Sequence, residues 1–123
     1  MTAYYYLESH EWAQADQDLY RIGLSSFAAG EVGDIIHVEL PAVGDQIERG
    51  QAMGEIESVK SVNDIYAPIS GQVVAVNEAL ADQPELINQD AQGSGWLLLV
   101  RCEQEQPLEG LMDDQAYQKH ISA

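Results

Sequence analysis

Short runs in which apolar and polar residues alternate dominate the chain, and residues that favour turns separate them. An alternation with a period of two is typical of half-buried β-strands. Glycine, proline, asparagine and aspartate lie between the runs, where their backbone preferences suit tight turns. The runs with this pattern are DLYRIG, DIIHVEL, QIE, AMGEIE, the stretch from Ile65 to Ile69, GQVVAVN and GWLLLV. The pattern therefore predicts a mostly β fold.

Two segments predict helices instead of strands. SSFAAGEVGD reads as a short helix in the N-terminal half, with Ser25 or Ser26 as its N-cap. Near the C-terminus, apolar residues recur at spacings that form one stripe on a helix, which predicts a helix over about residues 107–121. The members of this stripe are Leu108, Leu111, Met112, Tyr117, His120 and Ile121.

A weak internal similarity relates two of the expected strands. GDIIHV, at residues 33–38, resembles GQVVAV, at residues 71–76. We expect the first to pair with AMGEIE and the second with WLLLV. Two such half-units would pack face to face as a small flattened barrel or sandwich. At 123 residues the chain has the length of a single domain, 1–123, with an expected core over about 20–101.

The formal charge of −16 excludes some partners. Phosphates repel so acidic a surface, so we expect no binding to nucleic acid or to an anionic membrane. One cysteine, Cys102, permits no internal disulfide. The N-terminal segment MTAYYYLESHEW has neither a secretory nor a transit pattern. These features lead us to expect a cytoplasmic, bacterial protein that is monomeric.

The joint between the two half-units carries Lys60, one of only five Lys and Arg residues in the chain. The runs GEIE and DIYAPI, separated by SVKSVN, suit an antiparallel hairpin with Lys60 near its tip. Such a residue can be an ordinary solvated lysine. A Schiff-base role is disfavoured, because Glu55, Glu57 and Asp64 are close in sequence and would stabilise the ammonium. An exposed lysine on a hairpin also suits a carrier, because another enzyme can reach and acylate it.

The segment ESVKSVNDIYAPISG, at residues 57–71, resembles the lipoylation region of the glycine cleavage system H protein family. A biotin acceptor would have methionines on both sides of the lysine, where this chain has Val59 and Ser61. Five more segments resemble the family in the same order along the chain: SHEW, VGDIIHVELPAVGD, VVAVNEAL, PELIN and GWLLLV. The resemblance therefore covers nearly the whole sequence.

The resemblance implies a lipoyl/biotinyl-type barrel-sandwich hybrid, or hammerhead, with lipoic acid attached as an amide to Lys60. It implies a carrier that catalyses no step itself. The family's lipoyl group receives an aminomethyl group from P protein (glycine decarboxylase) and passes the one-carbon unit to T protein (aminomethyltransferase). L protein (dihydrolipoyl dehydrogenase) then reoxidises it. A lipoate ligase or lipoyl transferase would attach the cofactor.

The family holds its loaded arm in a surface cleft. Carried over by position, Glu11 and Asp64 are the candidates for contact with the aminomethyl amine, and Glu31 is a third candidate. A carboxylate beside that cation is physically sensible, although each residue also reads as a surface acid or a turn residue.

Two other functions remain open. H-like lipoate-binding proteins of bacterial sulfur oxidation use a similar lipoyl carrier with a heterodisulfide-reductase-like complex. An interaction module that has kept the fold would leave Lys60 unmodified. No metal-ligand spacing relates the three histidines, so no metal site is predicted.

Overall fold

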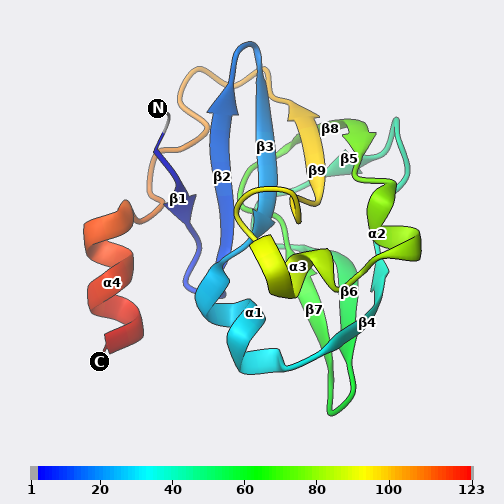
Figure 1. The fold of residues 1–123 in the computed structure, drawn as a ribbon. Coiled ribbons are helices and arrows are strands. Elements are labelled where there is room, and N and C mark those ends of the chain that lie inside the picture. Colours follow the sequence, from blue (N-terminus) through cyan, green and yellow to red (C-terminus); the bar gives the residue numbers. More distant parts are fainter. Residues whose placement is uncertain (1–2, 123) are drawn as a thin grey trace.

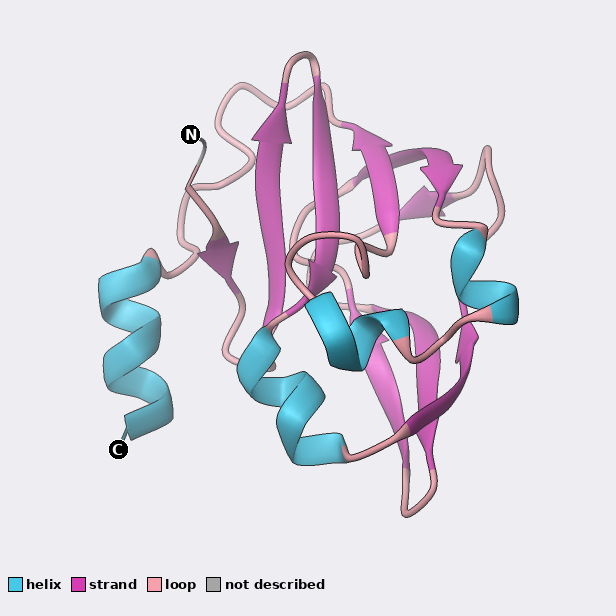
Figure 2. Cartoon of the chain, viewed as in Figure 1, coloured by secondary structure: helices cyan, strands magenta, loops and turns pink. Residues whose placement is uncertain are grey.

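The computed structural model describes residues 3–122, and its strands form two antiparallel sheets (Figures 1 and 2). The larger sheet has the order β1-β2-β3-β9-β8-β5, and the smaller has the order β4-β6-β7. The strands are β1 (Tyr5–Tyr6), β2 (Glu11–Asp16), β3 (Leu19–Leu24), β4 (Ile35–Glu39), β5 (Gln46–Ile47), β6 (Ala52–Ser58), β7 (Val62–Tyr66), β8 (Gly71–Val76) and β9 (Leu98–Arg101). The expected mostly β fold is confirmed.

The pairing of the two half-units follows the internal similarity of the sequence. β4 pairs with β6, and β8 pairs with β9, as the repeated pattern predicted. The two sheets are unequal in size, because β1, β2 and β3 extend the larger sheet beyond the repeat. These added strands supply one wall of the site described below.

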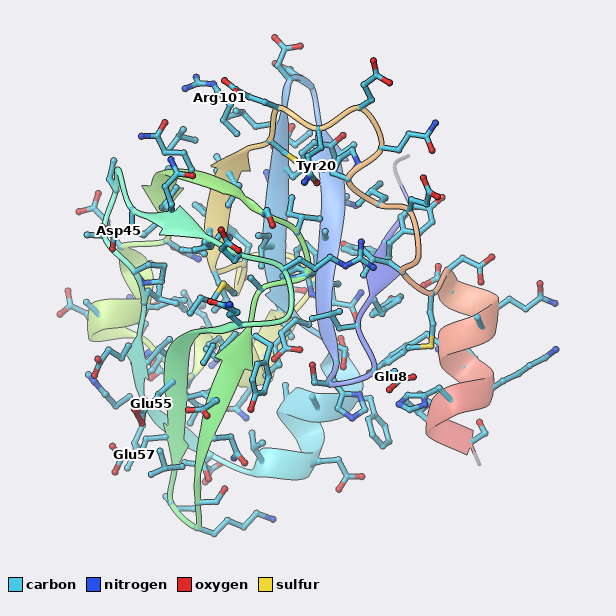
Figure 3. The ribbon with its side chains drawn as sticks, turned by 180° about the vertical axis from the view of Figure 1, so that it is seen from behind. Glu8, Tyr20, Asp45, Glu55, Glu57 and Arg101 are labelled. Carbon is cyan, nitrogen blue, oxygen red and sulfur yellow. The ribbon has the colours of Figure 1, made fainter. Side chains whose placement is uncertain are left out.

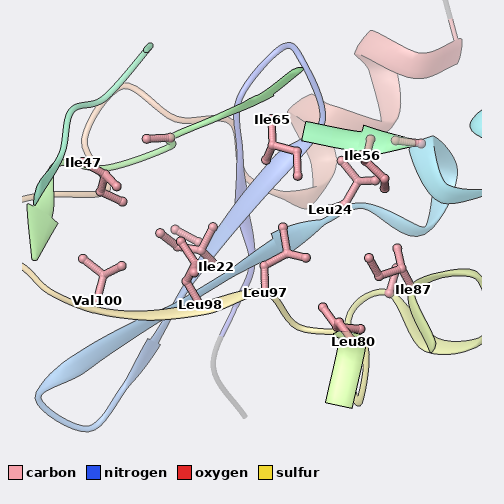
Figure 4. Close-up of a cluster of buried hydrophobic side chains, with 14 of the residues drawn as sticks. Ile22, Leu24, Ile47, Ile56, Ile65, Leu80, Ile87, Leu97, Leu98 and Val100 are labelled. Atoms are coloured by element: carbon pink, nitrogen blue, oxygen red, sulfur yellow. The ribbon is translucent and has the colours of Figure 1, made fainter. Parts of the chain in front are cut away.

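Side chains from both sheets meet in one apolar core (Figure 4). Ile22 and Leu98 come from the larger sheet, and Ile56 and Ile65 come from the smaller one. All four are at most 2% exposed. Burial of this kind is worth about 1.5–3 kcal/mol for each large aliphatic side chain. The core therefore fixes the smaller sheet, and the hairpin that it carries, against the larger sheet.

The core begins earlier in the chain than the sequence predicted. Trp12 and Ala13, on β2, are fully buried, although the expected core began near residue 20. The indole of Trp12 donates to the carbonyl of Leu24 at 2.8 Å, which satisfies its one polar group. Glu11, Trp12 and Ala13 are consecutive buried residues at the start of β2, so this strand lacks the regular alternation that predicts a half-buried strand.

Four helices flank the sheets within residues 3–122: α1 (Ser26–Val32), α2 (Ala79–Asp82), α3 (Leu86–Asp90) and α4 (Asp114–Ser122). Ser25 is the N-cap of α1, and its hydroxyl accepts from the Ala28 amide at 3.1 Å, which selects between the two predicted caps. None of the described helices has the length and apolar character needed to cross a membrane.

The C-terminal helix is shorter than predicted. It begins at Asp114 rather than near residue 107. Gly110 has φ +87°, and Met112 exchanges two backbone hydrogen bonds with Tyr6, so the preceding segment cannot be helical. Asp113 then caps α4, because its carboxylate accepts from the Ala116 amide at 2.8 Å.

Candidate functional site: the lysine hairpin and the adjacent cleft

Lys60 lies in the tight turn that joins β6 to β7, as predicted, and its side chain is exposed. The Ser58 amide donates to the carbonyl of Ser61 at 2.8 Å and closes the turn. Ser58 is only 5% exposed, and its hydroxyl accepts from the amides of Lys60 (3.3 Å) and Ser61 (3.2 Å). The turn thus presents Lys60 on a backbone that is fixed at both ends.

The side chain of Lys60 lies against the turn between α1 and β4. A Cβ atom added at Gly33 would lie 3.2 Å from Lys60 Cε and 3.8 Å from Cδ and Nζ. Gly33 also has φ +81°, a region that favours glycine. The amide of Val59 donates to the Asp34 carbonyl at 3.0 Å, so the hairpin tip is tied to the same turn. Glycine at this position leaves room for the aliphatic stem of Lys60.

Asn88, on α3, fixes that turn from the other side. The Ile35 amide donates to Asn88 Oδ1 at 2.9 Å, and Asn88 Nδ2 donates to the carbonyls of Gly33 (2.8 Å) and Ala29 (3.3 Å). One amide side chain therefore satisfies backbone groups at the end of α1 and at the start of β4.

Replacing Asn88 with alanine is expected to lower the free energy of unfolding by about 1–2 kcal/mol, since these backbone groups lose their partner. Chemical denaturation measures the change. Gln89→Ala is the matched control, because Gln89 is an exposed neighbour on the same helix. Equal stability of the two variants would show that water replaces Asn88 at no cost.

A hollow of about 360 Å³ lies between α1 and β7, and we name it the α1–β7 cleft. Its lining is partly apolar and contains all three predicted carboxylates. The lining residues are Ser9, His10, Glu11, Leu24, Phe27, Ala28, Glu31, Val32, Ile56, Asn63, Asp64 and Tyr66. Val32 precedes Gly33, so the cleft adjoins the turn on which the Lys60 side chain leans. The structure thus brings the lysine and the predicted acids to one region.

Glu11 is the buried acid of this cleft, with 1% exposure. Its Oε2 accepts from the Tyr66 amide at 2.8 Å, and its Oε1 accepts from the Ser9 hydroxyl. Burial raises the pKa of the Glu11 carboxyl, and these hydrogen bonds oppose that rise. Because Glu11 belongs to β2 and Tyr66 to β7, one side chain joins the two sheets at the floor of the site.

Asp64 and Glu31 lie at the surface of the cleft, and both are exposed. Glu31 is in the last turn of α1. Asp64 is paired in register with Glu55, which in turn pairs with Glu39, so three carboxylates form a row across the smaller sheet. Figure 3 shows Glu55 on β6. We name Glu39, Glu55 and Asp64 the carboxylate row. Glu11 and Asp64 therefore differ in solvation, although the same contact with the amine was predicted for both.

His10 and Phe27 also line the cleft, and the sequence did not single them out for it. Their rings lie 5.4 Å apart between centroids. His10 Nδ1 shares a hydrogen bond with the Tyr117 hydroxyl at 2.7 Å, and burial lowers the pKa of the His10 imidazole, as does nearby His120. The one available signal was the position of His10 beside Glu11 in SHEW.

These features permit a specific kind of chemistry. An exposed primary amine on a rigid turn is accessible to an acylating enzyme. An elongated group joined there can lie along the turn and reach a hollow with apolar walls. Buried and exposed carboxylates in that hollow suit a cationic end group.

Comparison with known proteins gives concordant results. A family model described as glycine cleavage H-protein matches residues 4–123. The chain is 53% identical over 117 residues to a probable glycine cleavage system H protein of Natronomonas pharaonis, covering 95% of this chain and 92% of that protein. It is 48% identical over 114 residues to a glycine cleavage system H protein of Listeria monocytogenes, covering 93% and 91%. The crystal structure of a glycine cleavage system H protein from Mycobacterium marinum superposes with a TM-score of 0.90, at 35% identity and 98% coverage of both chains.

Proposed function

The chain belongs to the glycine cleavage H-protein family, and on that premise we propose that it carries lipoic acid as an amide on Lys60. The observation that carries this proposal is the placement of Lys60 on a fixed, exposed turn that adjoins the α1–β7 cleft. The attached group would supply a dithiolane that accepts and releases both a one-carbon unit and electrons.

The residues present fit such a group. The space above Gly33, which a Cβ atom would fill, accommodates the stem of Lys60. The wall formed by Leu24, Ala28 and Val32 is apolar and suits an acyl chain. Amide formation would also remove one of the few positive charges of the chain. The arm would then have less attraction to the acidic surface around the hairpin.

We further propose that this carrier receives the aminomethyl group from P protein, delivers it to T protein and passes electrons to L protein. A lipoate ligase or lipoyl transferase would attach the cofactor at Lys60. Within the cleft, Glu11 is proposed to face the cationic amine, with Asp64 and Glu31 nearer the solvent. The cleft would exclude water from the loaded arm. The named relatives support glycine cleavage in preference to sulfur oxidation.

Mass spectrometry of protein isolated from its native host tests the first step. We expect a lipoyl increment on the peptide that contains Lys60. The purified protein should then stimulate the exchange reaction of P protein. Lipoylation without stimulation would favour a carrier for another pathway, and a bare lysine in cells that lipoylate other proteins would favour an interaction module.

A further inference from the structure

One hydroxyl group connects the C-terminal helix to two regions next to the α1–β7 cleft, the loop before β2 and the start of α1. Tyr117 Oη lies 2.7 Å from His10 Nδ1 and 2.6 Å from Ser25 Oγ. Tyr117 is 2% exposed, and Ser25 is fully buried. A buried, hydrogen-bonded cluster of this kind is energetically coupled, because each group that loses its partner remains desolvated.

The two partners of that hydroxyl lie at the starts of two different elements, β2 and α1. His10 immediately precedes β2 and lines the cleft itself, next to Glu11. Ser25 caps α1, whose residues Phe27 and Ala28 also line the cleft. The separation between the loop before β2 and the start of α1 is therefore set partly through Tyr117.

The backbone of His10 needs such support. Its φ of +86° lies in a region that residues other than glycine adopt uncommonly. Two hydrogen bonds hold the main chain of His10. Its amide donates to the Leu7 carbonyl at 3.0 Å, and the His10 carbonyl accepts from the Ser25 amide at 2.8 Å. Tyr117 holds the imidazole, which is the part that faces the cleft.

Tyr117 is also the buried residue of α4. Its ring stacks on that of Tyr6, with centroids 4.0 Å apart and an interplanar angle of 5°. Figure 1 shows α4 beside β1, at the side of the molecule and away from the smaller sheet. Tyr117 therefore links the helix to the residues that line the cleft, beside the hydrogen bonds of Asp114 with Tyr6 (2.8 Å) and of His120 with the Glu8 carbonyl (3.0 Å).

We propose that Tyr117 is a positioning residue for the carrier: its hydroxyl holds the loop before β2 against the start of α1, and the α1–β7 cleft protects the loaded arm only while these two parts of its lining are held together. This inference rests on the function proposed above. It adds a role for the C-terminal helix, which contributes no side chain to the cleft lining.

The test compares Tyr117→Phe with Tyr6→Phe. Both changes remove one phenolic hydroxyl and keep the stacked ring pair. Tyr6 Oη donates to Asp114 at 2.8 Å and accepts from Gln92 Nε2 at 3.2 Å, so its hydrogen bonds go to neither His10 nor Ser25. In Tyr6→Phe, Gln92 Oε1 still accepts from the Ser26 amide of α1, which lies 3.0 Å away. A general loss of helix docking should therefore affect both variants, and a specific effect on the cleft should appear only in Tyr117→Phe.

The first measurement uses the unmodified protein and amide hydrogen exchange. Tyr117→Phe is expected to speed exchange about three- to tenfold at residues 28–32 of α1, because Ser25 loses a partner while it caps that helix. Tyr6→Phe should leave these amides within about twofold of the wild type. Equal exchange at residues 28–32 in all three proteins would overturn the proposal, independently of whether Lys60 carries a lipoyl group.

The second measurement uses protein that P protein has loaded, and it follows ammonia release without T protein. Release should be about three- to tenfold faster from Tyr117→Phe and unchanged in Tyr6→Phe. Equal release from both variants, or release from the wild type as fast as from the unfolded chain, would overturn the proposal. An exchange effect without any loading by P protein would support Tyr117 as the residue that sets the cleft and would count against the glycine cleavage function.

Discussion

The Lys60→Arg variant is expected to accept no lipoyl group and to show no stimulation of P protein, while keeping its fold. The guanidinium is always protonated, so it cannot attack an activated acyl group. The side chain at this position is exposed, and the backbone of Ser58 and Ser61 closes the turn. The free energy of unfolding should therefore change by no more than about 0.5 kcal/mol.

Incubation with a lipoate ligase, lipoate and ATP, followed by intact mass, measures the first effect. Lys119→Arg is the matched control, because Lys119 is the chain's other lysine and is exposed on α4. That variant should be lipoylated like the wild type. A lipoyl increment on Lys60→Arg would show that the acceptor is another residue. Unfolding of the variant would show that the Lys60 side chain is needed for the fold.

Replacing Glu11 with glutamine is expected to raise stability and to weaken protection of the loaded arm. The glutamine oxygen can still accept from the Tyr66 amide, and its nitrogen can donate to Ser9. The variant no longer buries a charge, which is favourable. It also loses the charge-assisted contact proposed for the aminomethyl amine, and release of ammonia without T protein should rise roughly tenfold, or about 1.4 kcal/mol.

The pH dependence distinguishes this explanation from a change in packing. Burial raises the pKa of Glu11 in the folded state above its unfolded value, so the folded state binds the proton more tightly. The stability advantage of Glu11→Gln should be largest above the raised pKa. It should shrink as pH falls toward the ordinary glutamate range, where the wild-type carboxyl is itself neutral.

Thermal unfolding at several pH values and ammonia release together check this prediction. Glu8→Gln is the control, since Glu8 is exposed in the neighbouring loop and does not line the α1–β7 cleft. A less stable Glu11→Gln protein would show that the buried charge is compensated by its hydrogen bonds. Unchanged release would remove Glu11 from contact with the arm.

Local patterns were sufficient for the parts of the site that depend on neighbouring residues. The alternation on both sides of Lys60 predicted the hairpin, and Ser25 could be named as a possible cap because capping needs only the following turn. The pairing of β4 with β6 followed from a repeated run. The resemblance to a family then directed attention to Glu11, Glu31 and Asp64, and all three line one cleft.

Features that depend on distant residues were not predictable in this way. The burial of Glu11 results from the approach of β7, and the hydroxyl of Tyr117 meets His10 across 107 positions in the chain. The C-terminal helix was predicted too long because an apolar stripe continued past Gly110. The stripe carried no signal that Met112 would pair with Tyr6 as in a sheet.

The carboxylate row makes the stability of the smaller sheet depend on the salt concentration. Like charges directly opposite one another across strands are destabilising, and Glu39, Glu55 and Asp64 are aligned in this way. All three are exposed, so mobile counterions can gather around them. The Debye length contracts from about 30 Å at 0.01 M salt to about 3 Å at 1 M. Ionic strength is therefore a determinant of how firmly the lysine-bearing sheet holds together, and dilute buffer is the condition in which it is weakest.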